Sequence, residues 1–339
     1  MSRRLVLALS LAAIAGLYAW SFNAYLVDRS SDFALVWAAA RGWLHSLDPY
    51  TVAGPEPWRS FRYDFHLLYP LTAVVVAVPF ALIPLHVSEG IFVAVSVGLF
   101  VWAVTRERIA SPVLWVLVSY AGLQFMQVAQ WSALMTAAAL IPALNWLLVI
   151  KPTIGLAFFA AYPSRRAAIG CALFVALTVA ISPWWVHEWL DLMIRGEDSA
   201  HITAPLLQWV GGGPFLALAA WKWRRAEARL LLGLALIPHT PELYDLVPLF
   251  LIVTCLEEGM ILFTCVLIAH VVRVNLLPAP NSFAQLWAVN AWVFTAFVYL
   301  PCLVMVLRRP NVWRDARNPA GHQHREIIAT QQSHATNAL

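Results

Sequence analysis

The chain has 339 residues, of which 61% are hydrophobic and only 12% are charged, about half the charged share that is usual for a soluble domain. A mean hydropathy of +0.71 and a net charge of only +4 exclude a disordered chain, a nucleic-acid-binding domain and an ordinary cytosolic enzyme. Because the apolar residues form long runs broken by short polar stretches, the sequence predicts an all-α, polytopic transmembrane helix bundle.

Six apolar runs approach the roughly 20 residues that a helix needs to cross the hydrocarbon core. They cover 5–22, 86–105, 110–127, 167–184, 259–276 and 284–307. Shorter or broken runs cover 131–162, 213–223, 226–238 and 244–257. Together these runs predict about ten crossings. All four cysteines lie inside apolar runs, and we expect them to be reduced and structural.

The segment 67–85 is apolar but carries three prolines. Lys and Arg gather on cytoplasmic loops, and their positions decide whether this segment crosses the membrane. If it does not cross, 15 of the 22 basic residues fall on one side, in clusters at Arg3/Arg4, Arg106/Arg108, Arg165/Arg166, Lys222 to Arg229 and Arg308 to Arg325. If it crosses, 13 of those 15 move to the other side. We therefore predict a re-entrant or interfacial helix at 67–85 and two cytoplasmic termini.

This topology gives one integral membrane domain, residues 1–307, followed by a polar cytoplasmic tail at 308–339 that we expect to be disordered. Extracytoplasmic loops are predicted at 23–66, 185–213 and 239–245. Within the first loop, residues 33–44 are expected to form a helix at the interface, with Trp37 and Trp43 at headgroup depth.

Two charged residues stand out near this face. Asp32 lies about ten residues beyond the first run, where its carboxylate is either a general base or, with Ser31, a cap of the interfacial helix. Lys151 ends a 20-residue apolar run directly before Pro152. A lysine within a membrane segment either binds an anion such as phosphate or extends its ammonium group to the interface.

Several other polar residues map to the same face. Arg62 is a candidate for binding phosphate, and His239 is a candidate acid, base or phosphate ligand. Candidates for substrate binding are His66, Tyr69, Gln130, Tyr244 and Asp245. The simpler interpretation of each is a solvated loop, an aromatic belt or a helix-end hydrogen bond. An acid, a base and cations on one face suggest a reaction on a lipid-borne anionic substrate. The chain has none of the nucleotide-binding or zinc-protease motifs, and we expect no metal, no cofactor and no nucleic acid.

The order of short motifs resembles a known family. The motifs are Ser31-Asp32-Phe33, Asp48-Pro49-Tyr50, Leu68-Tyr69-Pro70-Leu71, Ala129-Gln130-Trp131-Ser132, Ile150-Lys151-Pro152-Thr153 and Pro238-His239-Thr240-Pro241 with Tyr244-Asp245. Over roughly residues 5–300 the chain resembles the membrane glycosyltransferases of the GT-C fold that use polyprenyl-phosphate sugars, in particular glycosyltransferase family 87. Where that family has Gly-Gln-x-Asn, this chain has Ala129-Gln130-Trp131-Ser132, and the polar hairpin usual before the lysine is missing.

The resemblance implies an inverting transferase without a metal, located in the plasma (inner) membrane. Its donor would be a hexose, typically mannose, on a polyprenyl monophosphate, and its acceptor a glycolipid or glycan. Asp32 would deprotonate the acceptor hydroxyl, while Lys151 and Arg62 would neutralise the departing phosphate. Two other hypotheses remain: a membrane transporter or lipid flippase, which broken helices and a buried lysine also suit, and a non-catalytic assembly protein.

Overall fold

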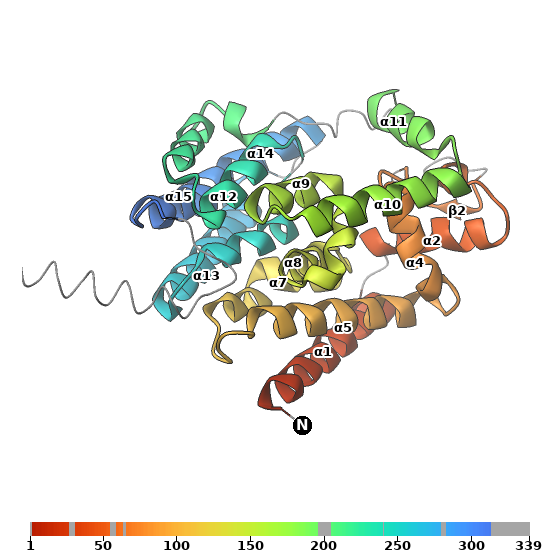
Figure 1. The fold of residues 1–339 in the computed structure, drawn as a ribbon, viewed down its shortest axis with the longest axis horizontal. Coiled ribbons are helices and arrows are strands. Elements are labelled where there is room, and N and C mark those ends of the chain that lie inside the picture. Colours follow the sequence, from red (N-terminus) through yellow and green to blue (C-terminus); the bar gives the residue numbers. More distant parts are fainter. Residues whose placement is uncertain are drawn as a thin grey trace, which may run out of the picture.

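The structure is a computed structural model that describes residues 2–26, 31–54, 59–63, 66–195, 205–239, 241–278 and 283–312. Its regular elements are nearly all helical (Figure 1). The first part of the chain forms α1 (Arg3–Ser21), the π-helix η1 (Phe22–Leu26), α2 (Asp32–Leu44), α3 (Pro49–Val52), β1 (Ala53–Gly54), β2 (Phe61–Arg62), α4 (Leu71–Ala81) and α5 (Leu85–Val104). The two strands pair in parallel, with Ala53 opposite Phe61.

The middle of the chain is built from shorter helices. It forms η2 (Pro112–Leu114), α6 (Trp115–Val118), α7 (Tyr120–Gln127), α8 (Ser132–Leu140), η3 (Pro142–Val149), α9 (Pro152–Ala161), α10 (Arg165–Ile181) and α11 (Trp185–Arg195). The last part forms η5 (Leu206–Gln208), η6 (Gly213–Lys222), α12 (Ala226–Leu236), η7 (Leu243–Ile252), α13 (Leu256–Val271), η8 (Val272–Leu276), α14 (Phe283–Phe294), η9 (Thr295–Tyr299) and α15 (Leu300–Leu307).

Four helices in the described part of the chain are long and apolar enough to cross a membrane: Arg3–Tyr25, Leu85–Val104, Leu256–Leu276 and Gln285–Leu307. A fifth is added if α10 and α11, which meet at a bend of 100°, count as one span. The first four coincide with the runs predicted at 5–22, 86–105, 259–276 and 284–307. The fold is therefore an all-α, membrane-embedded protein, while the full number of about ten crossings remains a prediction.

Two predicted apolar runs are broken helices. The run at 110–127 divides into η2, α6 and α7, and the break between α6 and α7 is at Ser119, whose backbone is extended with a ψ of 163°. The run at 131–162 divides into α8, η3 and α9. Its breaks fall at Ile141 and Lys151, each of which precedes a proline and has a non-helical backbone. A proline disfavours the helical conformation of the residue before it, and this steric effect sets both breaks.

The segment predicted as a re-entrant or interfacial helix, 67–85, forms α4, which has 11 residues. At about 1.5 Å per residue it is about 16 Å long, roughly half of what a membrane crossing requires. It packs against α2, whose residues Phe33 to Ala40 are all buried. The helix predicted at 33–44 is thus present, and the protein covers most of it, while its place at the membrane interface remains a prediction.

Buried aromatic side chains join α2, α5 and α8. The rings of Phe33 and Phe92 stack with centroids 4.3 Å apart, and the ring of Trp131 meets Phe92 edge-on at 4.8 Å. Pairs with these geometries contribute about 0.5–1.5 kcal/mol each beyond the area that they bury. Because Phe33 follows Asp32 and Trp131 follows Gln130, this cluster fixes the backbone of two candidate site residues.

Close packing between α1 and α5 depends on small residues. A Cβ atom added at Gly16 would lie 2.7 Å from the carbonyl oxygen of Gly90 and 2.8 Å from Cβ of Ala94. Small residues let helix backbones approach in this way inside a membrane, where van der Waals packing replaces the hydrophobic effect between helices.

The basic clusters meet at one end of the bundle. Arg4 donates to the carbonyl of Trp102, close to the end of α5 that carries Arg106. Arg108, in the same cluster as Arg106, donates to the Thr254 carbonyl just after η7, and Arg309, from a third cluster, donates at 2.6 Å to the carbonyl of Ile252, the last residue of η7.

The two remaining clusters lie at the same end. Arg225 donates to the carbonyl of Pro310 at 3.2 Å, and Arg229 donates to the carbonyl of Ala161, four residues before Arg165, at 2.7 Å. In Figure 1, α15 lies at this side, whereas α2, α4, β2 and α11 gather at the opposite side. Asp32 follows the far end of α1, so the cationic end and the candidate base are on opposite sides of the bundle.

Candidate active site

Asp32 is the first residue of α2, but it does not cap that helix. The cap is Ser31, whose hydroxyl oxygen accepts a hydrogen bond of 3.0 Å from the backbone N–H of Ala34. The backbone N–H of Asp32 is bonded to the carbonyl of Val128 at 3.1 Å. The carboxylate of Asp32 is therefore available for contacts with other segments.

The partner of this carboxylate is Gln130, which is 1% exposed. Its side-chain nitrogen donates to Asp32 Oδ2. Its side-chain oxygen accepts from the hydroxyl of Tyr69 at 3.0 Å and from the backbone N–H of Trp131 at 2.8 Å. One amide thus joins the start of α2, the segment before α4 and the start of α8.

The turn that presents Gln130 has an unusual backbone. Ala129 has a φ of 47°, in the left-handed region that costs a residue with a side chain about 1–2 kcal/mol. The N–H of Gln130 returns to the carbonyl of Phe125 at 2.8 Å and closes the turn. Ala129 occupies the position where the resembled family has glycine, which adopts this conformation without the steric cost.

Lys151 lies at the break between η3 and α9. Its ammonium nitrogen is 3.0 Å from Asp245 Oδ1 and 5.0 Å from the centre of the Tyr244 ring. Only 16% of the Lys151 side chain and 5% of the Asp245 side chain are exposed. The ammonium group therefore points into the protein, toward a buried anion.

The two halves of the site act on each other electrostatically. Burial raises the pKa of Asp32, and the negative charge of Asp245 adds to this effect, while Lys151 and hydrogen bonds from Tyr244 and Gln130 oppose it. The result is a carboxyl group whose pKa is above its ordinary value. A base of this kind has a stronger affinity for a proton near neutral pH than an exposed aspartate has.

Sequence reasoning missed the residues that support Asp245. Glu242 and Asp245 cap η7 reciprocally, and Glu242 forms an ion pair with Arg273 at 3.1 Å. The side-chain nitrogen of Asn290 donates to the carbonyl of Pro241 at 2.7 Å. The sequence did offer a sign of these contacts: Arg273 lies in the run 259–276 and Asn290 in the run 284–307, and polar groups inside membrane segments need buried partners.

The structure shows fewer contacts for the three remaining predicted site residues. His66 is buried between β2 and α4. Nδ1 of His239 is 2.8 Å from the Ile237 carbonyl, and its Nε2 is buried without a hydrogen-bond partner in the described part of the chain. The backbone of Arg62 pairs with Gly54, but its side chain lies outside the described residues. The predicted roles of these three residues remain predictions.

Within the described ranges, no three His, Cys, Asp or Glu side chains are close enough together to hold a metal ion. Comparison of the chain with models of known protein families, with curated proteins and with solved structures gives no match.

Replacing Asp32 with Asn should stabilise the protein at neutral pH. Because the folded pKa of Asp32 lies above its unfolded value of about 3.9, the carboxyl group costs stability as the pH rises above the unfolded pKa, and this cost is complete above the folded pKa. The difference in melting temperature between Asp32→Asn and wild type should be positive at pH 7 and shrink as the pH falls toward 4. Asp191→Asn, at a more exposed carboxylate, is the control. A lower melting temperature for Asp32→Asn at pH 7 would contradict the electrostatic argument.

The buried pair of Lys151 and Asp245 should show strong coupling. Lys151→Gln or Asp245→Asn alone leaves one buried charge without its partner and should cost about 3–5 kcal/mol of unfolding free energy, whereas the double variant should recover most of that loss. Denaturant unfolding in detergent measures all four states of the cycle. The exposed pair of His187 and Asp191 should give a coupling near zero. Additive losses at Lys151 and Asp245 would show that the pair is not coupled.

Proposed function

We propose that the protein is an inverting glycosyltransferase that moves a hexose, typically mannose, from a polyprenyl-phosphate donor to a lipid or glycan acceptor. The observation that carries the proposal is the ion pair of Lys151 with Asp245 at 3.0 Å, close enough to the Gln130-bonded carboxyl group of Asp32 for the charges to affect its pKa. A reaction that removes a proton and releases a phosphate needs one group of each kind.

In the proposed reaction Asp32 acts as the base and Lys151 stabilises the leaving group. Asp32 takes the proton of the acceptor hydroxyl, and the acceptor oxygen bonds to the anomeric carbon. The bond between that carbon and the phosphate oxygen breaks, and the polyprenyl phosphate leaves with the electron pair. Lys151 stabilises the negative charge of the phosphate, after exchanging part of its contact with Asp245 for the donor. Attack opposite the leaving group inverts the anomeric centre.

The other predicted residues take supporting roles in this proposal. Arg62 and His239 bind the donor phosphate beside Lys151. Tyr69 and Gln130 orient Asp32 and contact the acceptor. The hydrogen bonds from Tyr69 to Gln130 and from Gln130 to Asp32 support this role. His66, Tyr244 and Asp245 contact the sugar or the lipid headgroup. The resemblance to glycosyltransferase family 87 adds to the proposal independently of these contacts.

The proposed location is the extracytoplasmic face of the plasma membrane. A lipid-linked donor holds its phosphate at headgroup depth, so its catalytic groups belong at the end of the bundle rather than in its middle. The five basic clusters support a cytoplasmic position for the opposite end.

Topology is open to a direct measurement. A reporter fused at Thr51 should be extracytoplasmic, and reporters fused at Glu107 and Ala226 should be cytoplasmic, because α4 is too short to carry the chain across the membrane. A reporter at Glu107 that is read outside would mean that 67–85 crosses the membrane and would place the basic clusters on the wrong side.

Asp32→Asn should abolish sugar transfer while the protein stays folded. Loss of a general base lowers the rate about 10²–10⁴-fold. The assay incubates purified protein in vesicles with labelled polyprenyl-phosphate hexoses and follows labelled lipid or glycan products. Asp191→Asn, a change at a carboxylate of α11 whose side chain is 40% exposed, should keep the wild-type rate. Full activity of Asp32→Asn would remove Asp32 as the base.

One observation favours a second candidate function, a transporter or lipid flippase. Lys151 and Asp245 meet where η3 and α9 break, and broken helices with buried charges also form the substrate sites of transporters. Movement of a polyprenyl-phosphate sugar across the vesicle membrane, with no incorporation of the sugar into a product, would support this function and contradict the transferase.

A further inference from the structure

A second carboxyl group is buried beside the candidate site, and the proposed chemistry does not use it. Glu89 lies in α5, one of the helices long enough to cross a membrane, and is 1% exposed. Placing a carboxyl group inside such a segment is costly, so the group calls for an explanation. Two neighbours satisfy it: the hydroxyl of Ser31 donates to Oε1 at 2.5 Å, and Nδ1 of His86 lies 3.0 Å from Oε2.

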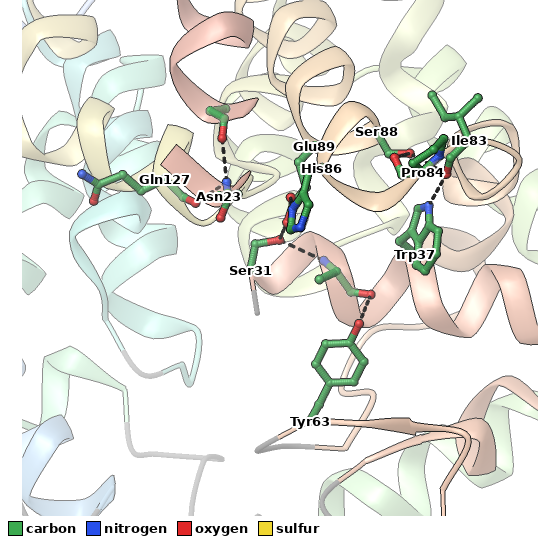
Figure 2. A network of polar contacts seen from close by, with 12 residues as sticks. Asn23, Ser31, Trp37, Tyr63, Ile83, Pro84, His86, Ser88, Glu89 and Gln127 are labelled. Carbon is green, nitrogen blue, oxygen red and sulfur yellow. Dashed lines mark hydrogen bonds and ion pairs between the residues drawn. The ribbon is translucent and has the colours of Figure 1, made fainter. Parts of the chain in front are cut away.

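Ser31 connects Glu89 to the start of α2. A serine hydroxyl has one proton and two lone pairs. Because that proton goes to Glu89, a lone pair is left facing the backbone N–H of Ala34, which is the capping bond of the helix. Glu89 therefore fixes the rotation of the hydroxyl that caps α2. Figure 2 shows the side chains of His86 and Glu89 together above Ser31.

The next residue in the chain is Asp32. The start of α2 is held on one side by Glu89 through Ser31 and on the other by the turn at 128–130, through the carbonyl of Val128 and the amide of Gln130. Figure 2 also shows Tyr63, whose hydroxyl donates to the carbonyl of Ala34 at 3.0 Å and secures the first turn from a third side.

We infer that Glu89 is a positioning residue for Asp32: it holds Ser31, and through it the first turn of α2, so that the Asp32 carboxylate stays aligned with Gln130. The inference rests on the proposed function, in which Asp32 takes the proton of the acceptor. A misplacement of a reacting group by about 1 Å can cost about 100-fold in rate. An anchor one residue away from the base is therefore enough to matter for the reaction.

Three variants separate positioning from general stability. Glu89→Leu removes the acceptor and fills the space, and replacing a buried charge with an apolar side chain is often neutral or stabilising for the fold. Glu89→Gln keeps an oxygen that accepts from Ser31. Ser31→Ala removes the link itself. For sugar transfer, Glu89→Leu should lower kcat about tenfold or more with little change in the KM for the donor, while Glu89→Gln should remain within about threefold of wild type.

The double variant Ser31→Ala/Glu89→Leu tests the route of the effect. If Glu89 acts through Ser31, its kcat should equal that of Ser31→Ala alone, because the link is already lost. Multiplied losses in the double variant would overturn the inference. So would a wild-type kcat for Glu89→Leu, or a loss in Glu89→Gln as large as that in Glu89→Leu.

A readout without sugar transfer keeps this test separate from the proposed function. Amide hydrogen exchange of the peptide that covers the first turn of α2 should be faster in Glu89→Leu and in Ser31→Ala than in wild type, and unchanged in Glu89→Gln. Faster exchange in these two variants of a protein that transfers no sugar would contradict the proposed transferase function but support the role of Glu89 in holding the first turn of α2. If the protein transfers sugar but Glu89→Leu changes neither the exchange nor kcat, only the positioning role of Glu89 is contradicted.

Discussion

One buried amide, the side chain of Gln130, joins the segments on which the candidate site depends. It gives its nitrogen to Asp32 and its oxygen to Tyr69 and to the backbone of Trp131. In a low-dielectric interior these bonds are strong, and an amide without them would be costly. The strained backbone of Ala129 is tolerated because several bonds on each side determine the same turn. The rings of Phe33 and Trp131, residues that follow Asp32 and Gln130 in the sequence, also pack against each other and support this arrangement.

The charges of the candidate site are costly for stability, as the proposed chemistry would require. A fold optimised for stability alone would not bury Asp245 against a lysine with a second carboxyl group, Asp32, within electrostatic reach. Lys151 serves both carboxylates, so its single positive charge leaves the cluster short of one cation. A phosphate donor would worsen this imbalance unless a proton or a further cation joined it, and the nearby ion pair of Glu242 and Arg273 has no charge to spare.

The sequence allows good prediction of the elements that depend on length and apolarity. The four long helices are evident because crossing lipid takes about 20 apolar residues, and α2 begins where a capping serine precedes Asp32. The breaks before Pro142 and Pro152 were also visible as prolines, but hydropathy averages over them. The contacts of the site were not predictable in this way. Asp32 meets Gln130 and Lys151 meets Asp245 across separations of 98 and 94 residues, which depend on how the helices pack. Glu89 was hidden because one carboxylate barely changes the mean hydropathy of a 20-residue helix.

The glycine contact between α1 and α5 has a consequence for biosynthesis. Gly16 and Gly90 are more than 70 residues apart, and α2, α3 and α4 come between them in the chain. At a translation rate of about 5–20 residues per second, the ribosome makes the second helix roughly 4–15 s after the first. During that interval the face of α1 that carries Gly16 is without its partner helix α5. The first turn of α2 likewise gains its bond to Glu89 only once α5 has been made.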